Sequence, residues 1–354
     1  MFEVLFMNRK LQKLSSLLRT WLAPLVAVSI IAGILCGLVF PDASQSLDAL
    51  IPITVFAMLY PPLINIDLGG LRRDFTNVPL IGAIIVLNFI LAPLAGALYA
   101  QFLSPIDPLL AVGFILKLSV PAAPMVVAWT GLADGRTETA LTAVTFSYIL
   151  SFFFIPFWTF TLVGTIVTVP VALFMNSLVI YVAVPLIAGI LSRQVILRYK
   201  SQEALNSVKP ALPPISSIGM FGIVFIIMAR EASMIISHLS SILIIVVGII
   251  IIYPLLFLLS TVYSKYAGFD YGDTIAMDYT VTAKSHGLTI ALAISTFGGL
   301  SVLPAAIAPI IQIPLMILIL HAGPKLRKFI DGSEERGMTR ELATPSSLAP
   351  KQSD

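Results

Sequence analysis

The chain has 354 residues, of which 58% are hydrophobic and 11% charged, and its formal net charge is +3. Soluble chains carry about 25% charged residues, so this composition excludes an ordinary soluble domain. The small positive charge gives no reason to expect a nucleic-acid partner. The single cysteine, Cys36, excludes an internal disulfide and a multi-cysteine metal site, and the three histidines are far apart in sequence. We therefore expect no metal and no cofactor.

Long apolar runs recur from Trp21 to Ala322, and each can be divided into lengths of about 20 residues, which span a hydrocarbon core of about 30 Å. These runs lack strand-like alternation and are too long for barrel strands, so they predict an all-α integral membrane protein. The ten predicted transmembrane helices cover 21–40, 47–66, 78–102, 108–130, 138–163, 169–192, 212–230, 238–262, 273–297 and 301–322.

The distribution of positive charge predicts the orientation. With a cytoplasmic N-terminus, 18 of the 21 lysines and arginines fall in cytoplasmic segments, as the positive-inside rule requires. The run from Trp21 is too long for the core of a signal peptide, so we expect it to be retained. The predicted domains are a cytoplasmic segment (1–20), a membrane domain (21–322) and a cytoplasmic tail (323–354), which its polarity predicts to be disordered. No organelle-targeting segment is visible, which favours a multi-pass protein of the plasma (cell inner) membrane with both termini cytoplasmic.

A short repeat predicts two related halves. The sequence Ile-Ala-Gly-Ile-Leu at 31–35 recurs at 187–191, and Pro93 and Pro254 are separated by nearly the same offset. Five helices per half is an odd number, so the second half must be inverted in the membrane. Two inverted five-helix repeats are typical of secondary transporters, whose sites lie near the bilayer midplane on discontinuous helices.

Three charged residues, Lys117, Asp278 and Lys284, lie deep inside predicted helices. A charge at the bilayer centre costs about 2.5–3.5 kcal/mol on insertion scales, so such residues face a cavity or each other and are the first candidates for a functional site. Asp278 and Lys284 are six residues apart, on different faces of one helix. They can pair only if that helix breaks between them, and the sequence leaves this open.

The fourth and ninth predicted helices are the irregular ones. Pro121 and Pro124 each remove a backbone donor, so the helix over 108–130 should unwind near its centre. The helix over 273–297 has no proline but a polar run that lipid would not tolerate. In the predicted topology the two are antiparallel and can cross at their breaks near the midplane, where half-helix ends would face a solute. Lys284 would neutralise the exposed carbonyl ends or hold an anionic substrate; a purely structural role for the prolines and charges stays open.

Two other classes of protein, an intramembrane enzyme and a membrane sensor, are alternatives to a transporter. For an intramembrane enzyme, Ser285 and His286 are the nearest nucleophile and base, but neighbours on a helix point about 100° apart and no third group orients them. We therefore do not expect an enzyme. A membrane sensor that binds a ligand without transporting it remains an alternative.

Several segments resemble the arsenite-efflux permeases of the bile acid:sodium symporter superfamily. The residues that carry the likeness are 34–41, Met-Leu-Tyr-Pro-Pro-Leu at 58–63, Asn-Phe-Ile-Leu-Ala-Pro-Leu at 88–94, 124–129 and 288–298, and it extends over about 20–330. The resemblance implies a panel of helices 1, 2, 6 and 7 that rocks against a core of helices 3–5 and 8–10. It also implies that Tyr60 and Asn65 line the panel side of the site.

The departures from that family shape the functional hypothesis. The permeases carry a cysteine where this chain has Ala122. The sodium-coupled branch uses a glutamate and a glutamine where this chain has Thr280 and Lys284, and a fixed ammonium repels a cation strongly in a low dielectric. We therefore expect a sodium-independent secondary transporter of a small anionic or organic solute, in which Lys284 replaces the coupling ion. A desolvated lysine can also exchange its proton, so proton coupling is open.

Arsenite or antimonite efflux is the alternative within transport. The expected partners are a small-molecule or ion substrate and the lipid bilayer, and the oligomeric state is open. The candidate substrate- or ion-binding residues are Tyr60, Asn65, Asn88, Lys117, Pro121, Ala122, Pro124, Asp278, Thr280, Lys284, Ser285 and His286.

Overall fold

The computed structural model describes residues 18, 21–65, 78–237 and 239–331. Within these ranges the regular structure is helical, apart from one isolated β-bridge. Six segments of the described part of the chain are long and apolar enough to cross a membrane: Val78–Leu103, Thr137–Thr165, Val171–Tyr199, Gln202–Arg230, Ile242–Ala267 and Gly299–Asp331. Shorter apolar helices cover Pro24–Val39, Ile51–Leu63, Pro108–Ser119 and His286–Thr296. The chain is an all-α, multi-pass membrane protein.

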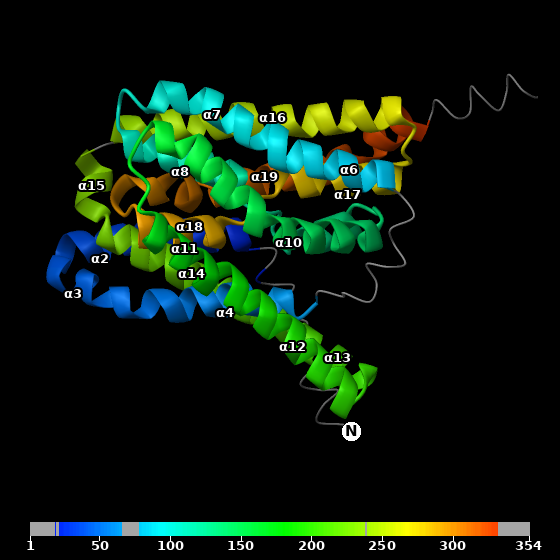
Figure 1. Ribbon diagram of the computed structural model, residues 1–354, viewed down its shortest axis with the longest axis horizontal. Coiled ribbons are helices and arrows are strands. Elements are labelled where there is room, and N and C mark those ends of the chain that lie inside the picture. The colour runs from blue at the N-terminus through cyan, green and yellow to red at the C-terminus, as the bar shows by residue number, and fades with distance from the viewer. Residues whose placement is uncertain (1–17, 19–20, 66–77, 238, 332–354) are drawn as a thin grey trace, which may run out of the picture.

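The helices follow the predicted order along the chain (Figure 1). The first half contains α2 (Leu22–Val39), α3 (Pro41–Ser46), the 3₁₀ turn η1 (Leu47–Leu50), α4 (Ile51–Leu63), α6 (Val78–Val86), the π-helical turn η2 (Leu87–Leu91), α7 (Ala92–Leu103), α8 (Pro108–Ser119), α9 (Val126–Leu132), α10 (Thr137–Thr161) and the 3₁₀ turn η3 (Val163–Thr165). The second half contains α11 (Val171–Leu178), the π-helical turn η4 (Val179–Ala183), α12 (Val184–Tyr199), α13 (Gln202–Val208), η5 (Lys209–Ala211), α14 (Leu212–Arg230), α15 (Ala232–Ser237), α16 (Leu239–Ala267), α17 (Tyr271–Thr282), α18 (His286–Thr296), η6 (Gly299–Val302) and α19 (Leu303–Asp331).

Several helix ends differ from the sequence prediction. The helix α19 continues to Asp331 rather than ending at 322, and α16 continues to Ala267 rather than 262. Hydropathy marks the apolar part of a helix, whereas lysine and arginine are good helix formers that extend it beyond the hydrocarbon region. The predicted tail therefore starts within a helix. Its part beyond Asp331, and the predicted segment 1–20 apart from Leu18, lie outside the described residues.

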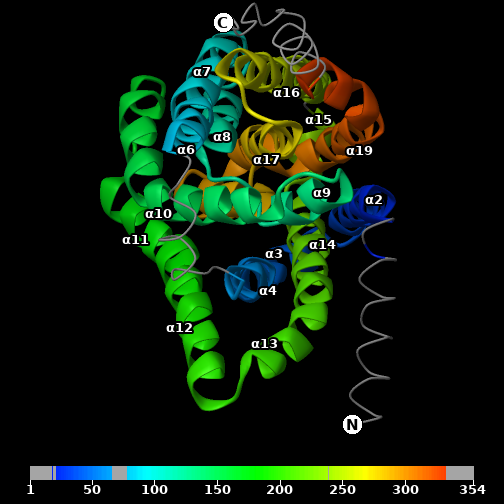
Figure 2. The ribbon, with the colours of Figure 1, turned by 90° about the vertical axis from the view of Figure 1, so that its right-hand side faces the viewer.

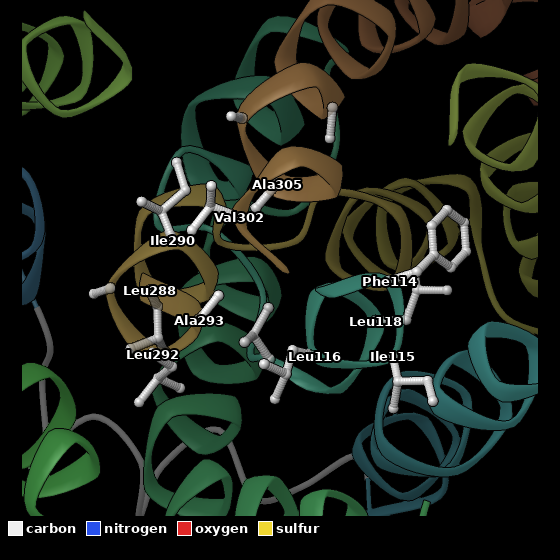
Figure 3. Close-up of a cluster of buried hydrophobic side chains, with 14 of the residues drawn as sticks. Phe114, Ile115, Leu116, Leu118, Leu288, Ile290, Leu292, Ala293, Val302 and Ala305 are labelled. Atoms are coloured by element: carbon white, nitrogen blue, oxygen red, sulfur yellow. The ribbon is translucent and has the colours of Figure 1, made fainter. Parts of the chain in front are cut away.

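Two groups of helices are distinguishable (Figure 2). The first, which we call the four-helix layer, consists of α2, α4, α12 and α14, with α14 packed on α2 and α4, and α12 packed on α4. The second, the main bundle, consists of α6–α10 and α16–α19, with α7 packed on α8 and α16 packed on α17 and α19. The core of the main bundle gathers apolar side chains from α8 and α18, with Val302 and Ala305 beside them (Figure 3).

Glycines bring the helices of the four-helix layer close together. A Cβ on Gly37 of α2 would lie 1.9 Å from the main-chain oxygen of Ala229 in α14. A Cβ on Gly33 would lie 2.6 Å from the oxygen of Phe225 in α14, and one on Gly189 of α12 would lie 2.8 Å from Leu63 of α4. Such close approach is how helices associate in lipid. The recurring pentapeptide thus places a glycine at a helix contact in each half of the chain.

Candidate functional site

Two helical segments of the main bundle are each interrupted, and the two interruptions contact each other. The first stops at Ser119 and resumes at Val126, and the second stops at Thr282 and resumes at His286. Ala122 and Lys284 form an antiparallel β-bridge between the two breaks. The Ala123 N–H donates to the Ala283 oxygen at 2.7 Å, and the Ser285 N–H donates to the Pro121 oxygen at 3.0 Å. The interruption expected in each segment is present.

The two breaks have different local causes. In the first, Pro121 and Pro124 cannot supply the N–H groups that the oxygens of Lys117 and Val120 would accept in a continuous helix, so α8 must end. The second contains no proline. Its backbone leaves the helix at Ala283, with φ −90° and ψ 85°, where the main-chain groups bond to the first break instead. Pairing with the proline-containing segment therefore stabilises the second interruption.

The side chain of Lys284 is fully buried and its ammonium is surrounded by oxygens. Nζ donates to the main-chain oxygen of Asn88 at 2.8 Å and to the Asn88 side-chain oxygen, and it lies 3.5 Å from the oxygen of Val120. Asn88 belongs to η2, which precedes α7 and α8 in the chain. The ammonium is thus held by three oxygens contributed by two different helical segments.

Local backbone geometry explains why these oxygens are free. In η2 the Ala92 N–H donates to Leu87, five residues back, and Pro93 has no N–H, so no helical donor reaches the Asn88 oxygen. The oxygen of Val120 lacks its helical donor because residue 124 is proline. Unpaired buried oxygens are costly, and the lysine supplies the missing hydrogens.

Lys117 performs a related task from the other segment. Its side chain is 1% exposed, and its Nζ donates to the main-chain oxygen of Lys284 at 3.1 Å. Both lysines therefore place positive charge beside carbonyl oxygens at the crossing, as expected for cations near the C-terminal ends of half-helices.

Asp278 and Lys284 are not paired in the described structure. Asp278 accepts hydrogen bonds from Ser260 Oγ and, at 2.8 Å, from Thr261 Oγ1, both on α16. Lys284 turns toward Asn88, beyond the end of α17. Thr280, another candidate, donates its hydroxyl to the Ala276 oxygen within its own helix at 2.6 Å. The break thus separates the carboxyl and the ammonium instead of joining them.

A pocket of about 350 Å³ lies between the four-helix layer and the crossing. It is lined by Met58, Leu59, Pro62 and Asn65 of the α4 region, by Ala123–Met125, Val127 and Ala128, by Leu212, Pro213, Ser216, Ser217 and Met220 of α14, and by Ser285–Gly287. Asn65, Pro124, Ser285 and His286 are the sequence candidates that line it. Tyr60, Asn88, Lys117, Pro121, Ala122, Asp278, Thr280 and Lys284 do not.

The lining has several features that sequence reasoning missed. Ser216 donates to the main-chain oxygen of Met58 at 2.6 Å, whose helical donor is removed by Pro62. The sequence did contain a signal for this wall of the pocket, because Ser216 and Ser217 are adjacent polar residues within an apolar helix. His286 opens α18, and its Nδ1 has no hydrogen-bond partner among the described residues. Tyr60 instead connects α4 to α12, with its hydroxyl 2.8 Å from Ser192 Oγ.

Comparison with known proteins agrees with this architecture. Residues 52–238 match the Sodium Bile acid symporter family. An arsenical-resistance protein Acr3 of Corynebacterium glutamicum is 24% identical over 78% of this chain and 79% of its own length. An uncharacterized transporter of Synechocystis is 26% identical over 86% and 88%, and the Acr3 of Alkaliphilus metalliredigens is 25% identical over 85% and 91%. The chain belongs to the sodium bile acid symporter family and is a membrane transporter.

Proposed function

We propose that this protein is a sodium-independent secondary transporter of a small organic anion, in which the ammonium of Lys284 takes the place of a coupling cation. The observation that supports this most directly is the set of oxygens around Nζ, from Asn88 and Val120. Main-chain oxygens of unwound helices are the ligands that transporters of this kind offer to Na⁺. A tethered ammonium among them opposes cation binding by repulsion in a low dielectric.

The pocket favours a small solute with an apolar body and a negative group. Its lining is mainly apolar, with Met58, Met125 and Met220 able to adapt to the shape of an apolar group. Its polar side is the start of α18, where Ser285 and His286 lie at the positive end of an 11-residue helix. A volume of about 350 Å³ is at the small end of the range for organic ligands, roughly 300–1,000 Å³.

Alternating access would move the four-helix layer against the main bundle, because the pocket lies between them. Inverted repeats are supported by the hydrogen bonds at the crossing. The Ala123 N–H donates to the Ala283 oxygen, and the Ser285 N–H donates to the Pro121 oxygen. If Ala123 corresponds to Ser285, and Pro121 to Ala283, the two bonds are equivalent, as a pair of repeats requires. We place the whole of 21–322 in this transporter domain, with both termini in the cytoplasm.

Thermal unfolding of the purified protein in NaCl and in KCl of equal concentration tests the role of Lys284. A ligand that binds only the native state raises stability. We expect the same Tm in both salts for the wild type. Lys284→Gln should gain a higher Tm in NaCl, because the oxygens become available. Lys325→Gln, at an exposed position of α19, is the matched control and should gain none. Stabilisation of the wild type by sodium would contradict the proposal.

Solute transport is measured in proteoliposomes with a panel of labelled monocarboxylates, dicarboxylates and sulfonates. Uptake of at least one of them should be unchanged when sodium is replaced by potassium on both sides. Competition that depends on the anionic group and on apolar bulk would support the solute class. Uptake that requires a sodium gradient would contradict sodium independence.

Arsenite or antimonite efflux is the second candidate, because two relatives are named arsenical-resistance proteins. Trivalent arsenic suits a thiolate ligand, but the crossing has Ala122 and the one cysteine, Cys36, lies on α2. We expect no resistance from this chain in a host that lacks its own arsenite pumps. Resistance from both the wild type and Cys36→Ser would establish efflux without a thiol and displace the organic-anion proposal.

A further inference from the structure

Asp278 is a buried carboxyl group that the crossing does not use. It is 0% exposed and lies on the face of α17 that packs against α16. Its hydrogen-bond partners are the hydroxyl groups of Ser260 and Thr261. No ion pair in the described part of the chain includes it. An ionised carboxylate buried without a cation is strongly disfavoured, so the way it is neutralised needs explanation.

The number of hydrogen atoms available for hydrogen bonds around Asp278 indicates that its carboxyl group is neutralised by a proton. Ser260 Oγ contacts both Asp278 Oδ1 and, at 2.9 Å, the Phe257 oxygen. Thr261 Oγ1 lies 2.8 Å from Asp278 Oδ2 and 2.9 Å from the same Phe257 oxygen. These are four contacts between oxygens, but each hydroxyl has one hydrogen and an ionised carboxylate has none. A proton on Asp278 supplies a third hydrogen, so one more contact becomes a hydrogen bond.

Among the described residues, the cations on the elements packed against α17 are not paired with Asp278. At the start of α17 the guanidinium of Arg136, the N-cap residue of α10, is bound to Asp270 and Asp273. On α16 the ammonium of Lys265 lies over the ring of Phe329, and on α19 the guanidinium of Arg327 lies over Tyr271. The other titratable side chains on the elements packed against α17 are Glu138 and Tyr148 of α10, Tyr253, Tyr263 and Tyr266 of α16, and His321, Lys325, Lys328 and Asp331 of α19, with Tyr271 and Tyr279 on α17 itself.

The group formed by Asp278, Ser260 and Thr261 also leaves no room for a metal ion between its oxygens. The carboxylate oxygens and the two hydroxyls are in direct hydrogen-bond contact, whereas an inserted cation would separate them. Three hydroxyl residues, Ser260, Thr261 and Ser264, follow one another along α16 toward the end that joins α17. Ser264 is 0% exposed and its hydroxyl has no hydrogen-bond partner among the described residues. Asp278 is about 10 Å from the start of α17, at 1.5 Å per residue.

We propose that Asp278 is a proton-binding site of this transporter, separate from the solute pocket and from Lys284, and that it exchanges its proton through the end where α16 and α17 join. In this step the O–H bond of the carboxylic acid breaks, the electron pair stays on the carboxylate, and the proton passes to water beyond Ser264. Reprotonation reverses the step. The proposal assumes a transporter but depends neither on the solute nor on sodium independence.

Infrared spectroscopy of the purified full chain in lipid nanodiscs tests the site without any solute. The wild type at neutral pH should show the carbonyl stretch of a protonated, buried carboxylic acid, and this band should disappear reversibly as the pH is raised. Asp278→Asn should lack the band. Asp42→Asn, at an exposed position of α3, is the matched control and should retain it.

Two further variants keep the test decisive if Asp278→Asn does not fold. Ser260→Ala removes one hydroxyl partner, so the band should shift in frequency without vanishing. This variant identifies the band even if Asp278→Asn fails to fold. Ser264→Ala should slow the loss and return of the band after a pH jump. The proposal is overturned if the wild type lacks the band, or if the band persists at every pH at which the protein stays folded. It is also overturned if NaCl at constant pH removes the band, since that would indicate a cation site.

Discussion

The ammonium of Lys284 lies 2.8 Å from the main-chain oxygen of Asn88, a residue 196 positions earlier in the chain. This contact joins the break between α17 and α18 to the π-helical turn η2. It satisfies an oxygen that the turn and Pro93 leave without a helical donor. An irregularity in one helical segment is thus compensated by a charge from another.

The Asn88 side chain should tolerate a carboxylate better than an apolar residue. Its Oδ1 contacts Lys284, whereas its Nδ2 has no partner in the described structure. Asn88→Ala removes one acceptor of a buried ammonium and should cost about 1–3 kcal/mol. Asn88→Asp keeps an acceptor, adds an opposite charge and should be less destabilising. Thermal unfolding in detergent compares the variants; equal losses would show that the side-chain oxygen does not matter.

Trp158 and Pro93 should be coupled energetically. The Trp158 indole donates at 2.5 Å to the Phe89 oxygen, which an N–H at residue 93 would reach in α-helical register if that residue were not proline. Trp158→Phe should cost about 1–3 kcal/mol by leaving that oxygen unpaired. In the background of Pro93→Ala, which supplies an N–H, the same change should cost less. Trp21→Phe, at a side chain 55% exposed, is the control for indole removal. Additive losses in the double variant would contradict this coupling.

Gly37 should be much less replaceable than Gly82. A Cβ at Gly37 would lie 1.9 Å from the Ala229 oxygen, a backbone atom that cannot move aside cheaply. We expect Gly37→Ala to cost at least about 1–3 kcal/mol through overpacking between α2 and α14. Gly82→Ala meets nothing within 4 Å and should be neutral or stabilising by up to about 1 kcal/mol. Thermal unfolding distinguishes them, and similar Tm values would argue against the close approach.

Ser216 and Ser217 form a matched pair in the pocket wall. Ser216 satisfies the Met58 oxygen at 2.6 Å, so Ser216→Ala should cost about 1–3 kcal/mol by leaving a partly buried acceptor unpaired. Ser217 also lines the pocket, but Ser217→Ala should change stability little. Pro62→Ala should reduce the penalty of Ser216→Ala by restoring the helical donor. An unchanged penalty in that background would disprove the proposed compensation.

Arg136 should stabilise the main bundle in a way that depends on salt but not on pH near neutrality. Its guanidinium donates to Asp270 Oδ2 at 2.6 Å and also contacts Asp273, and the hydrogen bond that it donates to Asp270 raises the pKa of Arg136 above its ordinary value. A raised pKa in a base adds stability that is lost only as the pH rises through that pKa, far above neutrality. Arg136→Gln should therefore lower Tm equally from about pH 6 to 9.

The contribution of the Arg136–Asp270 pair should be modest, because these side chains are 45% and 48% exposed and exposed pairs contribute about 1 kcal/mol or less. Raising the ionic strength should shrink the difference between the variant and the wild type. Lys200→Gln, at an exposed position after α12, is the comparison for loss of charge. A difference that grows with salt would contradict the ion-pair explanation.

Sequence patterns predicted much of the main architecture correctly. Apolar runs of the right length identified an all-α membrane protein, and ordered short motifs identified the family. Pro121 and Pro124 located the first break, because a missing N–H acts on its own helix wherever the chain goes. The polar run from Thr280 to His286 indicated the second, because such side chains cannot face lipid.

The placement of the charged side chains could not be derived in this way. Lys284 was expected at the crossing, but the direction of its ammonium depends on oxygens freed at Asn88 and Val120, which come from other segments. Asp278 was considered a partner for Lys284, yet its hydroxyl partners come from α16. A helical period says which face a residue occupies, not which neighbour packs there.

The sequence alone therefore determined the fold class, the family and the positions of the helix breaks, because apolar length and missing backbone donors are local properties of the chain. Only the tertiary structure decided that both lysines turn to main-chain oxygens, that Ser216, Ser217 and three methionines line the pocket, and that Asp278 lies apart among hydroxyls. The physical reason is that each of these depends on satisfying buried polar groups across helices far apart in sequence, which no single segment specifies.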